Sequence, residues 1–182
     1  MTCPDPPLVT ASGFVGGKDI AGLCDAYTKM QGSTEPVGGA MAQWQLWSLL
    51  SSEGGVCARF VNGGQVYLAN EATLRVVVTG WKEYPASAPW APPAADLPLV
   101  LPVVDPGPDG TTTSDGVHRV LRAAVMVASK NGRLTNSVDA TSGTVTFTQV
   151  SDVDPGKGQS GTFDLWFGTD HVIGSFTASW CA

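Results

Sequence analysis

The chain has 182 residues, enough for one sizeable hydrophobic core, and its length requires no second domain. Hydrophobic residues make up 43% of the chain, which excludes global disorder, whereas charged residues make up only 14%, well below ordinary soluble domains. The net charge is −6, and the lysines and arginines are scattered singly, so the sequence carries no basic patch for nucleic acid or anionic lipid. We therefore expect no nucleic-acid partner.

The first part of the chain predicts a lead-in segment followed by a helix. Residues 1–12 are rich in proline and predict a lead-in that is either ordered by its contacts or frayed. The following residues show the i, i+3, i+4, i+7 spacing of an amphipathic helix, with Asp19 as its N-cap and Gly32 as its end. The apolar residues of this stripe are Ile20, Leu23, Cys24 and Tyr27. We therefore expect one short N-terminal helix.

Four segments after this helix predict strands, because they are apolar and separated by Gly-rich turn signals. The segments are residues 42–51, 56–61, 65–70 and 73–81. Their tryptophans, which we expect in the core, are Trp44, Trp47 and Trp81.

Residues 84–116 interrupt this pattern because they are rich in proline, which removes a donor from a sheet ladder. We expect a long surface excursion here, with an edge strand at residues 97–104. The excursion is either a solvated spacer between two halves of the sheet or a functional loop. The functional interpretation depends on Trp90, which prolines flank closely.

Residues 118–182 predict an antiparallel meander with one buried face. Residues 118–129 form a candidate strand, and Asn131-Gly132 is the turn signal of a two-residue hairpin. Three runs within residues 142–180 then alternate apolar and polar residues. The middle run places Phe163, Leu165 and Phe167 on one face of the strand and Thr162, Asp164 and Trp166 on the other. We therefore expect one mainly β domain over residues 1–182, an antiparallel β-sandwich or a strongly curved sheet.

The four cysteines, Cys3, Cys24, Cys57 and Cys181, form no metal-binding or haem-attachment motif. An even count in a charge-poor chain favours two disulfides and an oxidising compartment; buried free thiols in a cytosolic protein are the alternative. Sequence alone does not choose among the three pairings that four cysteines allow. No apolar run is long enough to span a bilayer. The cysteines favour an oxidising compartment, but the sequence as given shows no signal peptide. We therefore expect an exported chain whose export signal is missing from this sequence.

The sequence contains no motif for catalysis or cofactor binding: no nucleophile elbow, zinc-protease motif, P-loop or dinucleotide fingerprint. The two histidines, His118 and His171, fall at predicted strand ends. No spacing supports a triad of His171, Asp170 and Ser175. We therefore expect no cofactor, and a binding protein rather than an enzyme.

The remaining candidates are acidic loops and two tryptophans. The weak calcium candidates are Asp105, Asp109 and Asp115, whose spacing does not converge oxygens on one point, and turn formation is the alternative for them. Trp90 and Trp166 are the ligand-binding candidates, since aromatic rings on a loop or a solvated sheet face stack on sugars or dock proteins. The alternative for both is packing, and for Trp166 a cover by the helix is favoured.

The C-terminal pattern SGTVT…GTFD…FG…V.GSF.A..C resembles predicted secreted lipoproteins of unknown function from myxobacteria and their relatives. The matching positions are 142–146, 161–164, 167–168, Val172, 174–176, Ala178 and Cys181, with a weaker match at Leu23-Cys24. The resemblance implies a Cys24–Cys181 disulfide, which leaves Cys3 and Cys57 for each other unless Cys3 is lipidated. It brings no assigned activity and no site residues.

Together these observations predict an exported, disulfide-stabilised, non-catalytic binding module of the bacterial cell envelope, with a carbohydrate or a protein as ligand. One alternative is a structural envelope protein without a small-molecule ligand. The other is a hydrolase of unrecognised type, which would need two carboxylates or a His–carboxylate pair in a pocket.

Overall fold

The computed structural model describes residues 2–37, 41–61, 67–83, 93–103, 110–130, 133–150 and 158–180, and within them the chain is mainly β. The strands are β1 (Val9–Val15), β2 (Lys18–Asp19), β3 (Asp25–Val37), β4 (Met41–Ser51), β5 (Ala72–Glu83), β6 (Leu99–Pro102), β7 (Thr111–Thr112), β8 (His118–Lys130), β9 (Arg133–Asp139), β10 (Ser142–Val150), β11 (Gln159–Phe167) and β12 (Asp170–Trp180). The described helices are α1 (Val56–Val61) and a 3-10 turn at Ala94–Asp96. No helix in these ranges combines the length and apolarity needed to cross a membrane.

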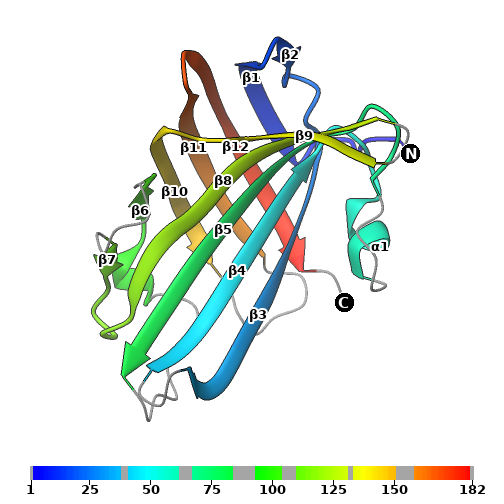
Figure 1. Cartoon of the computed structure of the whole chain (residues 1–182). Coiled ribbons are helices and arrows are strands. Elements are labelled where there is room, and N and C mark those ends of the chain that lie inside the picture. The colour runs from blue at the N-terminus through cyan, green and yellow to red at the C-terminus, as the bar shows by residue number, and fades with distance from the viewer. Residues whose placement is uncertain are drawn as a thin grey trace.

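One nearly closed sheet contains most of the strands, in the order β6-β10-β11-β12-β3-β4-β5-β8-β7. β1 pairs with β12 and β9 with β8. In Figure 1, β3, β4, β5 and β8 form the front layer, and β10, β11, β12 and β1 form the layer behind it. The layers join where β12 meets β3 in parallel, and a parallel bridge between Val103 and Leu121 links β6 back to β8.

The space between the two layers holds the main hydrophobic core. Leu46, Leu50 and Leu74 come from the front layer, and Phe147 and Leu165 from the layer behind it. All five side chains are at most 1% exposed. This arrangement explains the period-two pattern, because each strand turns alternate side chains into the core.

A buried polar contact supports the junction of the two layers. Gln159 on β11 is fully buried, and its side-chain amide donates to Thr28 Oγ1 at 2.6 Å, while Ser48 Oγ donates to its carbonyl at 2.9 Å. Thr28 lies on β3 and Ser48 on β4. Within the described residues, the β12–β3 pairing consists of two residue pairs, and these side-chain bonds add to that junction.

The meander predicted for the runs within residues 142–180 is confirmed, but it does not extend back to residue 118, because β9 pairs with β8 and the described residues show no pairing of β9 with β10. β10, β11 and β12 are consecutive antiparallel neighbours, and the inward residues of β11 alternate with exposed ones as the sequence predicts. The strand predicted at residues 118–129 is β8, and the edge strand predicted in the Pro-rich excursion is β6, at the end of the sheet order. β8 and β9 pair up to Lys130 and Arg133, while Asn131-Gly132 between them lies outside the described residues.

The predicted N-terminal helix is wrong, because Asp25–Val37 is strand β3. Ala26, Tyr27 and Thr28 are consecutive and all buried. The inner face of β3 meets the core and its outer face lies under α1, so its side chains do not alternate between buried and exposed.

The prediction of a strand at residues 56–61 is also wrong, because this segment is helix α1. Gly55 has a φ of 70°, which turns the chain before the helix, and the Asp25 carboxylate accepts from the Val56 amide at 3.1 Å. Val56 then packs on Tyr27, Leu49 and Tyr67. The strand predicted at residues 65–70 is not formed where it is described, since residues 67–68 have no regular structure and residues 69–70 form a turn.

The disulfide implied by the C-terminal resemblance is contradicted. Cys24 pairs with Cys3, with a Cα–Cα distance of 5.7 Å, and not with Cys181. Because Cys3 pairs with Cys24, the implied Cys3–Cys57 disulfide is also wrong. Cys57 is disulfide-bonded as well, and Cys181 lies outside the described residues. The lead-in places Cys3 beside Cys24, because the Leu8 amide donates to the Cys24 carbonyl at 2.8 Å. Residues 2–8 are therefore fastened to the sheet rather than frayed.

Candidate functional site

The outer face of the layer formed by β6, β10, β11, β12 and β1 is rich in hydroxyl side chains, and we call it the hydroxyl face. Its first cross-strand row is Val100, Thr146, Thr162, Ser175 and Thr10. Its second row is Pro102, Thr144, Asp164, Ile173 and Ser12. Its third row is Ser142, Trp166 and His171. The face thus brings together residues from both ends of the sequence.

Exposed apolar side chains of the described residues gather on this same face. The large ones are Phe14 at 55%, Val100 at 46%, Ile173 at 45% and Trp166 at 40% exposure. Phe14 follows Thr10 and Ser12 in the outward series of β1. Single exposed apolar residues are ordinary on a protein surface, whereas their concentration on one face indicates a contact surface.

An open depression lies at the centre of the hydroxyl face, with a volume of about 600 Å³. Its lining residues are Thr10, Ala11, Ser12, Thr144, Thr162, Phe163, Asp164, Ile173, Gly174 and Ser175. Gly174 allows β1 to pack this closely, since a Cβ there would lie 2.3 Å from the Thr10 carbonyl oxygen. The depression is therefore formed by backbones in close contact, by short polar side chains and by the apolar side chains of Ala11, Phe163 and Ile173.

Asp164 connects the depression to an aromatic pair. One carboxylate oxygen of Asp164, Oδ1, lies 2.8 Å from His171 Nε2, and because an ionised carboxylate only accepts, the imidazole N–H donates. The His171 ring stacks on Trp166, with centroids 4.2 Å apart and planes 12° from parallel. The second oxygen of Asp164 makes no hydrogen bond within the described residues, and the side chain is 60% exposed.

Of the two predicted ligand-binding tryptophans, Trp166 lies on the hydroxyl face and Trp90 lies outside the described residues. The favoured cover of Trp166 by the predicted N-terminal helix is wrong, because that helix does not form and α1 packs on β3 in the other layer. The ring is packed against His171 instead and keeps part of its surface in solvent.

The tryptophans predicted in the core are not fully buried where their side chains are described. Trp47 is half-buried on the outer face of β4, with Lys29 and Arg75 over its ring at 5.6 Å and 5.5 Å. Trp81 is half-buried, and its ring centroid lies 4.6 Å from that of His118. Both rings pack against cationic or imidazole groups outside the main core.

Asp115, a weak calcium candidate, is an ion-pair partner. Arg119 is fully buried and contacts Asp115 Oδ2 at 3.1 Å. Burial favours a higher pKa for Asp115, but hydrogen bonds from Arg119, Thr113 and the Val117 amide outweigh it and lower the pKa. Asp105 and Asp109 lie outside the described residues. In the described part of the chain, no three His, Cys, Asp or Glu side chains gather as they would around a metal ion.

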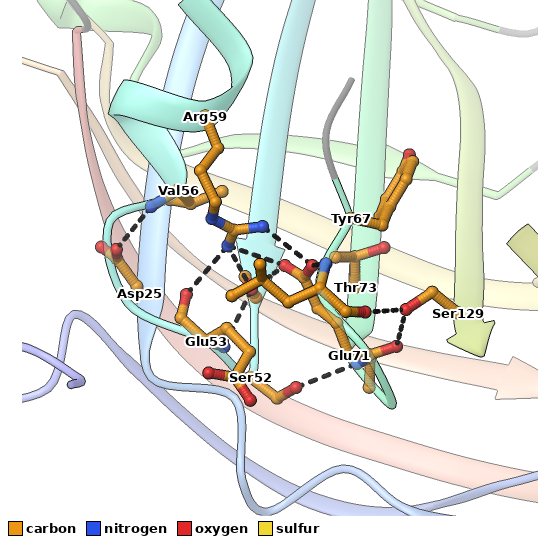
Figure 2. Close-up of polar contacts among 12 residues, drawn as sticks. Asp25, Ser52, Glu53, Val56, Arg59, Tyr67, Glu71, Thr73 and Ser129 are labelled. Atoms are coloured by element: carbon orange, nitrogen blue, oxygen red, sulfur yellow. Dashed lines mark hydrogen bonds and ion pairs between the residues drawn. The ribbon is translucent and has the colours of Figure 1, made fainter. Parts of the chain in front are cut away.

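A second polar cluster, which the sequence did not predict, surrounds Glu71 (Figure 2). Glu71 is fully buried, and Arg59 of α1 binds both of its carboxylate oxygens at 2.8 Å. Ser51 Oγ and the Leu68 amide donate to the same carboxylate at 2.5 Å and 2.7 Å. Each carboxylate oxygen is therefore bonded within the protein, and the cluster anchors α1 rather than offering a site. A single Arg and a single Glu, separated by twelve positions, left no motif in the sequence.

The histidine and serine of the hypothetical triad do not come together. His171 pairs with Asp164, while Asp170 Oδ2 accepts from the Gly16 amide at 2.7 Å. Ser175 Oγ lies 2.7 Å from Thr10 Oγ1, in a different cross-strand row from His171. The depression itself is lined by one carboxylate, that of Asp164.

Comparison with known proteins gives no family assignment. No protein-family model matches the chain, and searches of curated proteins and of solved structures find no match.

Proposed function

We propose that this chain is an exported, disulfide-stabilised, non-catalytic binding module of the cell envelope, whose hydroxyl face binds a carbohydrate. The observation that carries the proposal is the depression of hydroxyl side chains beside the exposed Trp166 ring. Sugars present hydroxyl groups and apolar C–H faces together, so a site for them combines short polar side chains with an aromatic surface. The disulfides support export, since such bonds persist in oxidising compartments.

A carbohydrate fits this face better than a protein partner does. Val100 and Phe14 lie on β6 and β1, at opposite sides of the face, with the threonine and serine rows between them. The centre of a protein interface is usually a contiguous apolar patch containing aromatic anchors. Here the centre is a depression in which threonine and serine side chains surround a single large exposed apolar residue, Ile173, while Val100, Trp166 and Phe14 lie outside its lining.

We also propose that the two layers are one strongly curved sheet rather than the separate sheets of a sandwich. The β12–β3 pairing and the Val103–Leu121 bridge support this description. The curvature holds the hydroxyl face on the outside, where a long polysaccharide can reach it.

The experiment compares Trp166→Ala with the unaltered chain in isothermal titration against a panel of soluble oligosaccharides. We expect the variant to bind about tenfold more weakly to the oligosaccharide of the panel that the unaltered chain binds most tightly, because ring stacking and apolar contact are lost. Trp47→Ala is the matched control, since it removes a partly exposed indole from the opposite layer. Its binding should be unchanged once thermal melting confirms that both variants are folded.

If no oligosaccharide or polysaccharide binds the unaltered chain, the carbohydrate proposal is wrong, and a structural envelope protein becomes the better description. Equal losses in Trp166→Ala and Trp47→Ala would also contradict it, because the effect would then not belong to the hydroxyl face.

A further inference from the structure

We infer that the carbohydrate recognised at the hydroxyl face carries a protonated amino group, as an amino sugar does. This inference depends on the proposed function and adds the charge class of the ligand. The ammonium group would pair with the Asp164 carboxylate in the central depression.

The first support is the position of Asp164. Its carboxylate is the one ionisable group that lines the depression, on β11 between Thr144 and Ile173. Oδ1 is engaged by His171, whereas no hydrogen bond to Oδ2 is formed within the described residues and the carboxylate is 60% exposed. An ammonium group has three donors and can use this oxygen while the neighbouring hydroxyls accept its other bonds.

The second support is the absence of lysine and arginine from this face. Among the described outward-facing residues of β6, β10, β11, β12 and β1, none is lysine or arginine. The nearby Lys18 of β2 donates to the Asn70 carbonyl at 3.1 Å. The net charge of −6 further disfavours uronic acids and sulfated sugars, since both are anionic.

The third support is the fixed orientation of Asp164. The His171 N–H donates to Oδ1, and the imidazole is itself held by stacking on Trp166. A carboxylate that is already oriented loses less side-chain freedom when the ligand binds. Trp166 and Asp164 share β11 and point to the same side, so one ligand can touch the ring and the carboxylate together.

The test compares glucosamine oligosaccharides with the same oligosaccharides after N-acetylation, which keeps the sugar ring and removes the charge. Titrations are run at about pH 6.5, below the pKa of an ordinary amine, on the full chain. We expect the amino form to bind about two- to fivefold more tightly, and this preference to shrink at high salt. Asp164→Asn should abolish the preference, because the negative charge is removed while the amide oxygen still accepts from His171.

Asp139→Asn is the matched control, since it makes the same charge change at an exposed site on β9, in the other layer. It should keep the preference for the amino form. Equal binding of the amino and N-acetylated forms overturns this inference and leaves the carbohydrate proposal intact. A preference that Asp164→Asn and Asp139→Asn reduce equally also overturns it, because net charge would then be the cause. Failure of every oligosaccharide to bind overturns both.

Discussion

Tyr27 shows how the burial of one side chain makes folding depend on pH. It lies on β3 beneath α1 and is 4% exposed. Burial raises its pKa from 10.0 to about 12, an effect that Arg75 partly opposes and Tyr67 reinforces. In the unfolded chain the phenol ionises near its ordinary pKa of about 10. The unfolded state therefore loses this proton first as pH rises.

The resulting prediction concerns alkaline stability. The contribution of Tyr27 is fully present below about pH 10 and is lost as pH rises toward 12, at a limiting rate of about 1 kcal/mol per pH unit. Tyr27→Phe cannot ionise, so its free energy of unfolding should fall less steeply over this window. Urea denaturation at several pH values above 9 measures the two slopes. Parallel slopes would show that Tyr27 is not the group responsible.

Residues of the candidate site differ in how far the sequence reveals them. The outward position of Trp166 follows from period-two alternation, because the opposite face of β11 is plainly apolar. The contributions of Thr10 and Ser12 could not be predicted, since they depend on the pairing of β1 with β12. Register between strands so distant in sequence is fixed by the folded core and leaves no local pattern.

At the scale of elements, alternation predicted strands best where one face is solvated. β10, β11 and β12 have one buried and one solvated face, and they fall where the sequence places them. β3 is covered on both faces near Tyr27, so its apolar residues do not alternate. Their spacing matched that of an amphipathic helix, and the sequence therefore predicted a helix. Residues 56–61 imitated a strand, because six residues are too few to display a helical period.

Helix α1 depends on the Glu71 cluster, which leads to a second prediction. Glu71→Gln keeps the size of the side chain but leaves the buried Arg59 charge without its carboxylate. We expect a loss of about 3–5 kcal/mol in the free energy of unfolding, because an unpaired buried charge remains. Urea denaturation by circular dichroism measures this loss.

Asp139→Asn serves as a control for this change, because it also removes one carboxylate charge, at an exposed position on β9. It should cost much less than Glu71→Gln. A loss below 1 kcal/mol for Glu71→Gln would mean that the ion pair contributes little to anchoring α1.

At the scale of the whole molecule, the Cys3–Cys24 disulfide joins the lead-in to the start of β3 across 21 positions of sequence. The loop it closes contains β1, the outermost strand of the hydroxyl face. Replacing both cysteines with serine should lower the free energy of unfolding by about 3 kcal/mol, through the added freedom of the unfolded chain.

Urea denaturation of the Cys3→Ser, Cys24→Ser double variant tests this, with the Cys57 disulfide left in place. The folded double variant should retain its oligosaccharide affinity, since neither cysteine lines the depression. An unchanged denaturation midpoint would show that the lead-in is held by its other contacts, such as the Leu8 amide on the Cys24 carbonyl.

The pairing of β1 with β12 has a consequence for how the molecule forms during synthesis. Val9 pairs with Phe176, so β1 leaves the ribosome long before the strand that will lie along its edge. Contacts this distant in sequence slow folding, because a long loop must close before they stabilise the chain. One edge of β1 and one edge of β11 thus stay unpaired until β12 has emerged, because β12 pairs with both strands, and unpaired strand edges promote aggregation. The hydroxyl face, which is proposed to bind sugar, is therefore among the last parts of the protein to form.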